Sequence, residues 1–455
     1  MDNEKGMTRR DFVTQTGRVA AGVGLGMAMA DRLIVPAQAQ TAAAARRAIG
    51  ANDRIVLALI GAGGMGRGNM GDLQNRPNVE IAAVCDPDRN HMAQAAEMVE
   101  KKSGRRPAQL KDFRRVLDMK DVDGVIIATP DHWHALPMIL ACQAGKDVHQ
   151  EKPISHNIWE GRQMANAAKR HGSVVQVNTW QRSTQHFVDA IDYARSGKLG
   201  KISIVRAWKT DNARVGQQQP KAPPAELDYE LWVGPAAFEP YRENRAHYNW
   251  RWYMNYGSGM TGDWGVHMID IAALGMSPDD DNLVMPTSVS SYGGKFLAPE
   301  DDRTAPDTHV ALYEYPDFVM QWETHAGGYG MDGGGDHGAE FLGTNGRLMV
   351  DRGGWQLWDR DNKPMEKVAS DRKVNDHNGN FLDCMRTRRQ TRAPIESLHK
   401  TTTLCHLANL AMLAGHTIEW DAAREVVTND RRAMDLLPYR RPYRKPWTLP
   451  TVKVS

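Results

Sequence analysis

The feature that most constrains the fold is a glycine-rich turn, GAGGMG at residues 61–66, directly after the apolar run RIVLALI at residues 54–60. Four further apolar runs of strand length follow (VEIAAVCD, DVDGVIIATP, KDVHQEKP and GSVVQVN), with helix-compatible stretches between them. Continuous apolar strands that alternate with helices are typical of a parallel sheet covered on both faces. The sequence therefore predicts an α/β, doubly wound domain over residues 54–178.

The glycines of this turn fit the pattern G-x-G-x-x-G of a dinucleotide-binding domain. Gly61 allows the tight turn, Gly63 lets the backbone approach a pyrophosphate, and Gly66 lets the next helix pack on the sheet. Asp86 ends the second strand about 20 residues later, where a carboxylate bonds the ribose hydroxyls of NAD and repels the 2′-phosphate of NADP. Arg89 follows Asp86 by three residues, so the sequence does not exclude NADP as the cofactor. The alternative is a glycine-rich turn in an α/β protein that binds no dinucleotide.

The third and fourth strands end on TPDHWH and EKP, at the edge where open α/β sheets bind ligands. Thr129 and Pro130 are expected along the nicotinamide-side ribose, and His134 either caps the next helix or lines the cleft. The residues predicted to contact the cofactor are Gly61, Gly63, Gly64, Met65, Gly66, Asp86, Arg89, Thr129, Pro130, His134, Glu151 and Lys152.

The EKP stretch also brings a cation to the cleft. Pro153 rigidifies the turn and directs Lys152 toward the cleft, where its ammonium group can hydrogen-bond a substrate hydroxyl. Its positive charge stabilises the alkoxide that develops as a hydride leaves. Taken alone, the Glu151–Lys152 pair is more often a solvated ion pair.

A second candidate for chemistry is GDWGVHMID, in which Asp263 and His267 are four residues apart. On a helix they share one face, so Asp263 can hold the imidazole in one tautomer while His267 removes a hydroxyl proton. The alternative is a first-turn acid followed by a satisfied core histidine. The pair lacks a convincing third ligand, so we predict no metal site.

From about residue 179 the pattern changes to alternating strands such as THVALYEYP and FVMQWETHA, with a late helix, TTTLCHLANLAMLAG. This pattern predicts a C-terminal α+β domain over residues 179–436 with a large, open, mostly antiparallel sheet. A tail rich in Pro and Arg, residues 437–455, either embraces a neighbouring molecule or lies loose.

The order of these motifs resembles the Gfo/Idh/MocA family, named for glucose–fructose oxidoreductase and inositol dehydrogenase. The resemblance covers about residues 54–430, including AEFLGTNGRLMVDRGG and NFLDCMRTRRQTRAPIE. It implies an N-terminal Rossmann domain and a C-terminal domain whose sheet often forms a homo-oligomer, here a dimer or tetramer. Lys152, Asp263 and His267 match the family's lysine, aspartate and histidine, which serve the alcohol-to-ketone step in inositol-dehydrogenase-like members. The implied function is NAD(P)-dependent oxidation of a sugar, polyol or glycoside hydroxyl.

Two further features bear on the substrate. Aromatic faces suit the apolar faces of pyranose rings, so Trp250 and Trp252 in HYNWRWYMNYG are candidate substrate contacts, although half of these aromatic residues are expected in the core. Arg182 in NTWQRS is a candidate for binding substrate hydroxyls, with an interdomain ion pair as the plainer alternative.

The N-terminus carries Arg9, Arg10 and Phe12 ahead of the apolar run GRVAAGVGLGMAMA. This layout predicts a twin-arginine signal peptide over residues 1–39, a flexible linker over residues 40–53, and a periplasmic or secreted protein. The alternative is a disordered, alanine-rich extension.

Export in the folded state makes sense for a nicotinamide enzyme only if NAD rarely leaves, because the periplasm holds no pool of it. NADH formed on a trapped cofactor must be reoxidised in the same site. One alternative function is therefore redox-neutral, an epimerisation or the cleavage of a glycoside through a keto intermediate. A second alternative is a non-catalytic sugar-binding protein.

Composition excludes several classes of partner. Lys and Arg number 57 against 55 Asp and Glu, a formal charge of +2 without long runs of one sign, so we predict neither nucleic-acid binding nor membrane insertion. The partner expected is a small sugar or polyol. The four cysteines lack metal-ligand spacing, and a bridge between Cys384 and Cys405 stays open.

Overall fold

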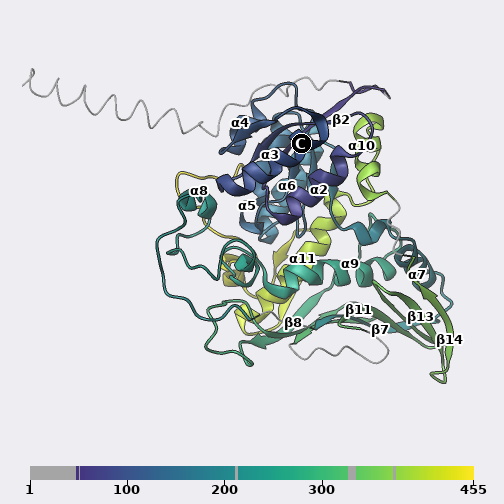
Figure 1. Cartoon of the computed structure of the whole chain (residues 1–455). Helices are drawn as coiled ribbons and strands as arrows, with labels where there is room; N and C mark the ends of the chain where they lie inside the picture. The colour runs from purple at the N-terminus through teal and green to yellow at the C-terminus, as the bar shows by residue number, and fades with distance from the viewer. Residues whose placement is uncertain (1–47, 51, 211–213, 326–334, 372–375, 455) are drawn as a thin grey trace, which may run out of the picture. The chain divides into compact units, whose positions relative to one another are not determined.

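The N-terminal half forms a six-stranded sheet in the order β3-β2-β1-β4-β5-β6 (Figure 1). Its strands are β1 (Ile55–Ile60), β2 (Val79–Cys85), β3 (Ala108–Leu110), β4 (Gly124–Ile127), β5 (Asp147–Gln150) and β6 (Val175–Val177). All five pairings are parallel. The Rossmann domain predicted from the sequence is thus confirmed.

The computed structural model describes residues 48–50, 52–210, 214–325, 335–371 and 376–454, which belong to one compact unit. The predicted twin-arginine signal lies outside the described residues. Cys384 and Cys405 are both buried free thiols, so they form no bridge. Over the described residues, no helix has the length and apolar character needed to cross a membrane.

Helices between the strands cover both faces of the parallel sheet. They are α2 (Gly64–Gln74), α3 (Arg89–Ser103), α4 (Phe113–Leu117), α5 (Asp131–Gln143) and α6 (Ile158–His171). Side chains of β1 alternate between two apolar clusters, with Ala58 in one and Leu57 and Leu59 in the other. Burial on both faces explains why these strands read as continuous apolar runs.

The C-terminal half forms a ten-stranded sheet in the order β14-β13-β12-β11-β7-β10-β9-β8-β15-β16. Its strands are β7 (Ile202–Thr210), β8 (Ser288–Gly294), β9 (Thr308–Glu314), β10 (Val319–His325), β11 (His337–Gly343), β12 (Gly346–Asp351), β13 (Gly354–Asp359), β14 (Pro364–Ala369), β15 (Ile418–Asp421) and β16 (Val426–Val427). Within this ten-stranded sheet, only the β7–β10 pairing is parallel among the described strands. The large, mostly antiparallel sheet predicted from the sequence is confirmed.

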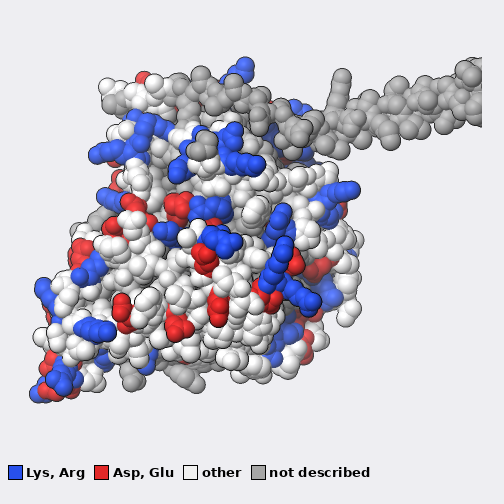
Figure 2. Space-filling model, turned by 180° about the vertical axis from the view of Figure 1, so that it is seen from behind, with Lys and Arg blue, Asp and Glu red and all other residues white. Residues whose placement is uncertain are grey.

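Helices cover one face of this sheet (Figure 1). The longer ones are α7 (Gln185–Arg195), α9 (Val266–Gly275) and α11 (Ile395–Ala414), and the short α8 spans Tyr229–Val233. The other face exposes apolar side chains, among them Ile204, Leu312 and Val319. The homo-oligomer stays a prediction. Figure 2 views the molecule from behind relative to Figure 1, and over most of this view acidic and basic side chains are interspersed.

The last quarter of the chain returns to the Rossmann half. Helix α10 (His377–Thr387) lies beside α2, and Phe381 belongs to the apolar cluster under β1 (Figure 1). The tail follows the same course. Arg441 donates to Glu160 at 2.7 Å and the ring of Trp447 packs edge-on against Trp133. Through residue 454, the tail is therefore a folded cover of its own chain's Rossmann half, in place of either alternative expected from the sequence.

Substitution Phe381→Ala is expected to lower the free energy of unfolding by about 3–5 kcal/mol, because it opens a cavity under β1. Denaturant unfolding measures this loss. Phe296→Ala is the matched control, since that ring is 69% exposed and its loss is expected to cost little. Equal costs for the two variants would contradict the packing of α10 into the Rossmann core.

Candidate active site

A cleft of about 430 Å³ lies at the carboxyl ends of the parallel strands. Its Rossmann side includes Gly61, Gly63, Gly64, Met65, Asp86, Thr129, Pro130, Glu151 and Lys152. Its other side comes from the second half of the chain and includes Leu231, Trp232, His247, Tyr248, Trp250, Arg251 and Asp263. The structure thus brings nine of the predicted cofactor residues and one of the predicted aromatic contacts to a single cleft.

The glycine turn fits a dinucleotide. Gly61 has φ +93°, and a Cβ there would lie 2.6 Å from the Ala128 carbonyl. A Cβ on Gly66 would lie 2.0 Å from the Gly61 carbonyl oxygen, so this residue packs the helix against the turn and does not line the cleft. Gly63 and Gly64 have open space where a Cβ would stand. Helix α2 begins at Gly64 without a side-chain cap, which leaves its first N–H groups available to phosphates.

Asp86 lies at the end of β2 as predicted. Its carboxylate accepts hydrogen bonds from the backbone N–H groups of Ala62 at 2.6 Å and Asp88 at 2.8 Å. Burial raises the pKa of Asp86 to about 7, although these two donors favour the ionised form. Ribose hydroxyls would add further donors to this carboxylate.

The nicotinamide end of the cleft also offers an unused polar atom. Oγ1 of Thr129 is buried and has no hydrogen-bond partner among the described residues, so a polar group of the cofactor can satisfy it. Glu151 accepts from the side-chain amides of Asn69 and Asn178, which hold this carboxylate at the cleft. The residues present therefore fit NAD from its phosphates to its nicotinamide.

Two predicted cofactor contacts lie elsewhere. The guanidinium of Arg89 donates to the carbonyl of Ala225 at 2.9 Å, and Arg89 does not line the cleft. His134 is buried, with its ring nitrogens 2.7 Å and 2.8 Å from the carbonyl oxygens of Pro153 and Thr129. It therefore positions two cleft loops from behind and is not a cleft-lining residue.

The centre of the site is an ion pair between the two halves of the chain. Nζ of Lys152 donates to Oδ1 and to the backbone oxygen of Asp263, each at 2.9 Å. Nε of Arg251 donates to the same Oδ1 at 3.3 Å. Burial alone would raise the pKa of Asp263, but the charges of Lys152 and Arg251 lower it to about 2. The carboxylate is therefore ionised between Lys152 and Arg251.

His267 does not donate the predicted hydrogen bond to the carboxylate of Asp263. Asp263 lies in a π-helical turn, Thr261–Gly265, ahead of α9, so the four-residue spacing does not have α-helical geometry. Nδ1 of His267 is buried without a hydrogen-bond partner among the described residues. Burial, and then the charges of Lys152 and Arg352, lower the pKa of His267 well below its usual value. The imidazole is neutral at neutral pH and close to both cations.

Of the two aromatic residues predicted to contact substrate, one lines the cleft and the other does not. Trp250 lines the cleft, and the guanidinium of Arg251 lies 4.4 Å from the centre of its ring. Trp252 is a core residue instead, with Arg303 over its ring and no place on the cleft. Trp250, Trp252, Tyr253 and Tyr256 are all buried and Tyr248 is exposed, so more of these aromatic residues are core than the half expected from the sequence.

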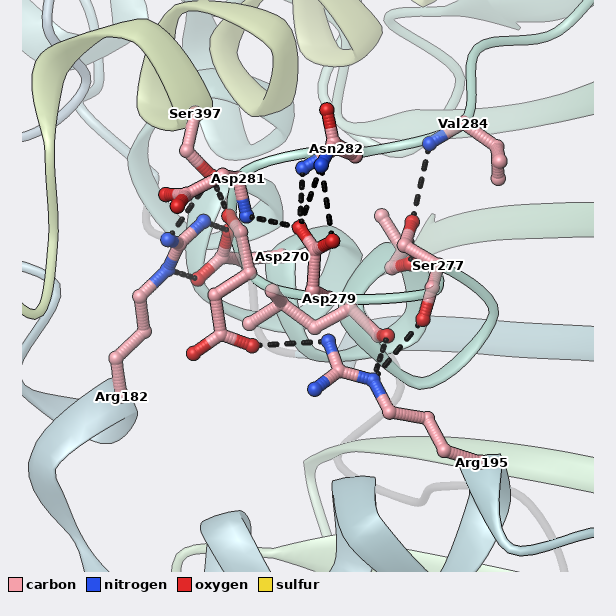
Figure 3. A network of polar contacts seen from close by, with 12 residues as sticks. Arg182, Arg195, Asp270, Ser277, Asp279, Asp281, Asn282, Val284 and Ser397 are labelled. Atoms are coloured by element: carbon pink, nitrogen blue, oxygen red, sulfur yellow. Dashed lines mark hydrogen bonds and ion pairs between the residues drawn. The ribbon is translucent and has the colours of Figure 1, made fainter.

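Arg182 lies in a buried polar network away from the cleft (Figure 3). Its guanidinium donates to both carboxylate oxygens of Asp270, at 2.8 and 2.6 Å, and to Oγ of Ser397 at 3.0 Å. Both side chains of the ion pair are 1% exposed. The geometry places Arg182 in a buried ion pair within the C-terminal half, in place of both the substrate contact and the interdomain ion pair, and the pair ties η1 (Trp180–Ser183) to α9 and α11.

Sequence reasoning missed three residues around the ion pair. Arg251 follows the predicted substrate contact Trp250, and Trp264 lies between Asp263 and His267. Their position next to predicted site residues was the sequence signal that could have identified both. Arg352 follows β12 and has no local signal. Among the described residues, no group of three or more His, Cys, Asp or Glu side chains could hold a metal ion.

Comparison with known proteins identifies the family. Residues 55–179 match the Gfo/Idh/MocA model described as "Oxidoreductase family, NAD-binding Rossmann fold", and residues 199–292 match the model of its C-terminal alpha/beta domain. The chain belongs to this oxidoreductase family. The family model names NAD, the cofactor predicted from the glycine turn and Asp86.

Curated relatives share part of the chain. The rhizopine catabolism protein MocA of Rhizobium meliloti is 31% identical over 163 residues, 35% of this chain and 48% of the relative. Levoglucosan dehydrogenase of Pseudarthrobacter phenanthrenivorans is 28% identical over 223 residues, 47% of this chain and 49% of the relative. A glycosyl hydrolase family 109 protein of Stenotrophomonas maltophilia is 27% identical over 262 residues, 56% of this chain and 54% of the relative. The chain spans about half the length of the curated relatives it matches.

Solved structures show the same fold. Levoglucosan dehydrogenase in complex with NADH superposes with a TM-score of 0.62 at 16% identity, covering 81% of this chain and 99% of that chain. GenD2 from gentamicin A biosynthesis, in complex with NAD, superposes with a TM-score of 0.61 at 18% identity, covering 83% of this chain and 99% of that chain. At these identities the likeness establishes the fold alone.

NAD is expected to bind the apoprotein more tightly as the pH rises through about 7, because the ionised Asp86 accepts the ribose hydroxyls and the protonated form does not. Binding below that pH must then release a proton. Calorimetric titration with NAD in buffers of different ionisation enthalpy measures both affinity and proton release. In Asp86→Asn the affinity is expected to be lower and independent of pH in this window. Equal proton release by the variant would rule out Asp86 as the titrating group.

Proposed function

We propose that the protein is an NAD-dependent oxidoreductase that oxidises a hydroxyl-bearing carbon of a sugar, polyol or glycoside. The observation that carries this proposal is the ion pair of Lys152 and Asp263, 2.9 Å apart in the same cleft as the glycine turn. The pair joins a cation that can bind a hydroxyl to the family's cofactor site.

Each residue has a distinct task in this reaction. NAD, when bound, supplies the hydride acceptor. Lys152 exchanges one hydrogen bond from Asp263 to the substrate hydroxyl, and its charge stabilises the alkoxide. Asp263, ionised between Lys152 and Arg251, holds the ammonium in place. The neutral imidazole of His267 has a buried Nδ1 without a hydrogen-bond partner among the described residues, and it accepts the hydroxyl proton.

Substitution Lys152→Met is expected to lower the rate of reduction of bound NAD by about 10²–10⁴-fold, because the developing alkoxide loses its hydrogen-bonded cation. The measurement is denaturing extraction of nucleotide before and after incubation with a panel of sugars. Lys169→Met, in the last turn of α6, is the control and is expected to behave as wild type. An unchanged rate in Lys152→Met would refute the role of this lysine.

Tight retention of NAD is supported by a strap, residues 225–232, that borders the adenosine end of the cleft. The backbone N–H of Asp228 donates to Pro87 at 3.0 Å, and that of Arg89 donates to Glu226 at 3.1 Å. Lys111 pairs with Asp228. Strap residues Leu231 and Trp232 line the cleft opposite the Rossmann side, so NAD bound there would leave only after the strap is displaced.

The double variant Lys111→Met/His247→Ala is expected to speed NAD release by up to about tenfold. It removes the Lys111–Asp228 ion pair and the contact of His247 with Asp88 at 3.1 Å, and each exposed pair contributes about 0.2–1 kcal/mol. Release is followed by dilution into an NAD trap. Lys221→Met, which removes the surface pair with Glu243, is the control. Release at the wild-type rate in the double variant would show that the strap does not retain NAD.

A redox-neutral outcome is the second candidate, favoured by the family 109 glycosyl hydrolase relatives. In that case the hydride taken from substrate returns to the same sugar after epimerisation or cleavage of a glycoside. Substrate deuterated at the reacting carbon separates both redox reactions from sugar binding, because label must pass to the bound nicotinamide in either redox reaction. Net oxidation then leaves labelled NADH and a ketone, whereas the redox-neutral reaction returns the hydride to the sugar and restores NAD. A protein that never acquires the label is a sugar-binding protein. Export by the twin-arginine route remains part of this proposal, since it accords with a retained cofactor.

A further inference from the structure

Arg352, directly after β12, is a cation that forms no ion pair with any carboxylate of the described residues. Its guanidinium lies 4.8 Å from the ring centre of Trp180 and 4.3 Å from that of Trp264. Nε and Nη2 each donate to Oε1 of Gln181 at 3.2 Å. Within the described part of the chain, no carboxylate lies at ion-pair distance from this half-buried side chain. Two indoles thus hold the guanidinium in one plane, and the negative charges of Asp336 and Asp263 act on it from beyond ion-pair distance.

Another arginine of the same strand shows the usual arrangement. Arg347 lies 3.7 Å from the ring centre of Trp358, but it also donates to Glu340 at 2.8 Å. Burial lowers the pKa of Arg352 to about 10, which reflects a cation held out of water. A desolvated charge that lacks a counterion is costly, and such groups are common where a charged ligand binds.

Arg352 lies in the surroundings of the proposed base. Its charge, like that of Lys152, lowers the pKa of His267. The ring of Trp264, on which Arg352 packs, is 6.1 Å from the imidazole of His267. A ligand group held by Arg352 would therefore belong to the same molecule that presents its hydroxyl to Lys152 and His267.

Around His267, Arg352 differs from the other cations in forming no ion pair among the described residues. Lys152 and Arg251 flank Asp263, and burial raises the pKa of the neighbouring Asp131. Farther along the sheet, Lys209 pairs with Asp336, which also bonds His337 at 2.6 Å. Lys152, Arg251 and Lys209 thus each pair with Asp263 or Asp336, whereas Arg352 pairs with neither. The phosphates of NAD belong at the glycine turn and do not supply the missing anion.

Building on the proposed function, we propose that Arg352 binds a carboxylate of the substrate, so that the enzyme acts on sugar acids such as uronates or their glycosides. The planar guanidinium presents a fork of N–H donors that matches a carboxylate in two parallel hydrogen bonds. Its Nη1 makes no hydrogen bond among the described residues and is open to this pairing. Trp180 and Trp264 hold the fork in place, which reduces the ordering that the ligand must bring about.

The test compares matched sugars on the NAD-loaded protein: glucose with glucuronate, galactose with galacturonate, and the methyl glycosides of each. Wild type is expected to prefer each uronate in kcat/KM by about ten- to hundredfold, the contribution of a charge-assisted hydrogen-bonded pair. Arg352→Gln is expected to remove the preference, and Arg352→Lys to retain part of it. Arg347→Gln, which alters the paired arginine of the same strand, is expected to retain it in full.

Several results would overturn the proposal while leaving the proposed function intact. These are equal turnover of neutral sugars and uronates, a preference that survives in Arg352→Gln, or a preference for glucose 6-phosphate over glucuronate. If no sugar reduces the NAD, the proposed function fails, and calorimetric titration of glucuronate still decides the present inference. Binding by wild type that Arg352→Gln loses would support it, and absent or equal binding would refute it.

Discussion

The ion pair of Lys152 with Asp263 is the contact on which the site depends. Lys152 follows a strand of the parallel sheet, and Asp263 precedes a helix of the second half, so their 2.9 Å contact sets how cofactor and substrate residues meet. Both side chains are 13% exposed, and a partly buried charge that loses its partner is costly. The same pair that holds the halves in register therefore also keeps the ammonium aimed at the cleft.

Around this pair, the two ends of the site differ in character. The cofactor end is built mainly from backbone: a glycine turn, the first N–H groups of α2, and Asp86 held by two amides. The substrate end is built from side chains with unused polar atoms, Nδ1 of His267 and Nη1 of Arg352, neither of which has a hydrogen-bond partner among the described residues. Backbone donors suit a ligand that stays, whereas open side-chain groups suit one that is exchanged in every catalytic cycle.

The sequence predicted what depends on local patterns. Both sheets, the glycine turn, Asp86 and the place of Lys152 follow from alternation and from strand ends. It did not predict pairings between distant residues, such as Arg182 with Asp270, because a charged residue in sequence carries no sign of its partner. The sequence also did not predict that Asp263 lies in a π-helical turn and not in an α-helix. The carboxylate of Asp263 is bound by the distant Lys152 and by Arg251, and these tertiary contacts leave no pattern in the local sequence.

The return of the chain to the Rossmann half has a consequence for the order of events in synthesis. Phe381 fills the core beneath β1, and Val452 lies in the cluster on the opposite face of the sheet. The dinucleotide-binding half therefore cannot complete its packing until almost the entire chain has left the ribosome. The Rossmann core that surrounds the NAD site is thus complete only after residue 452 has been synthesised and has folded back onto it.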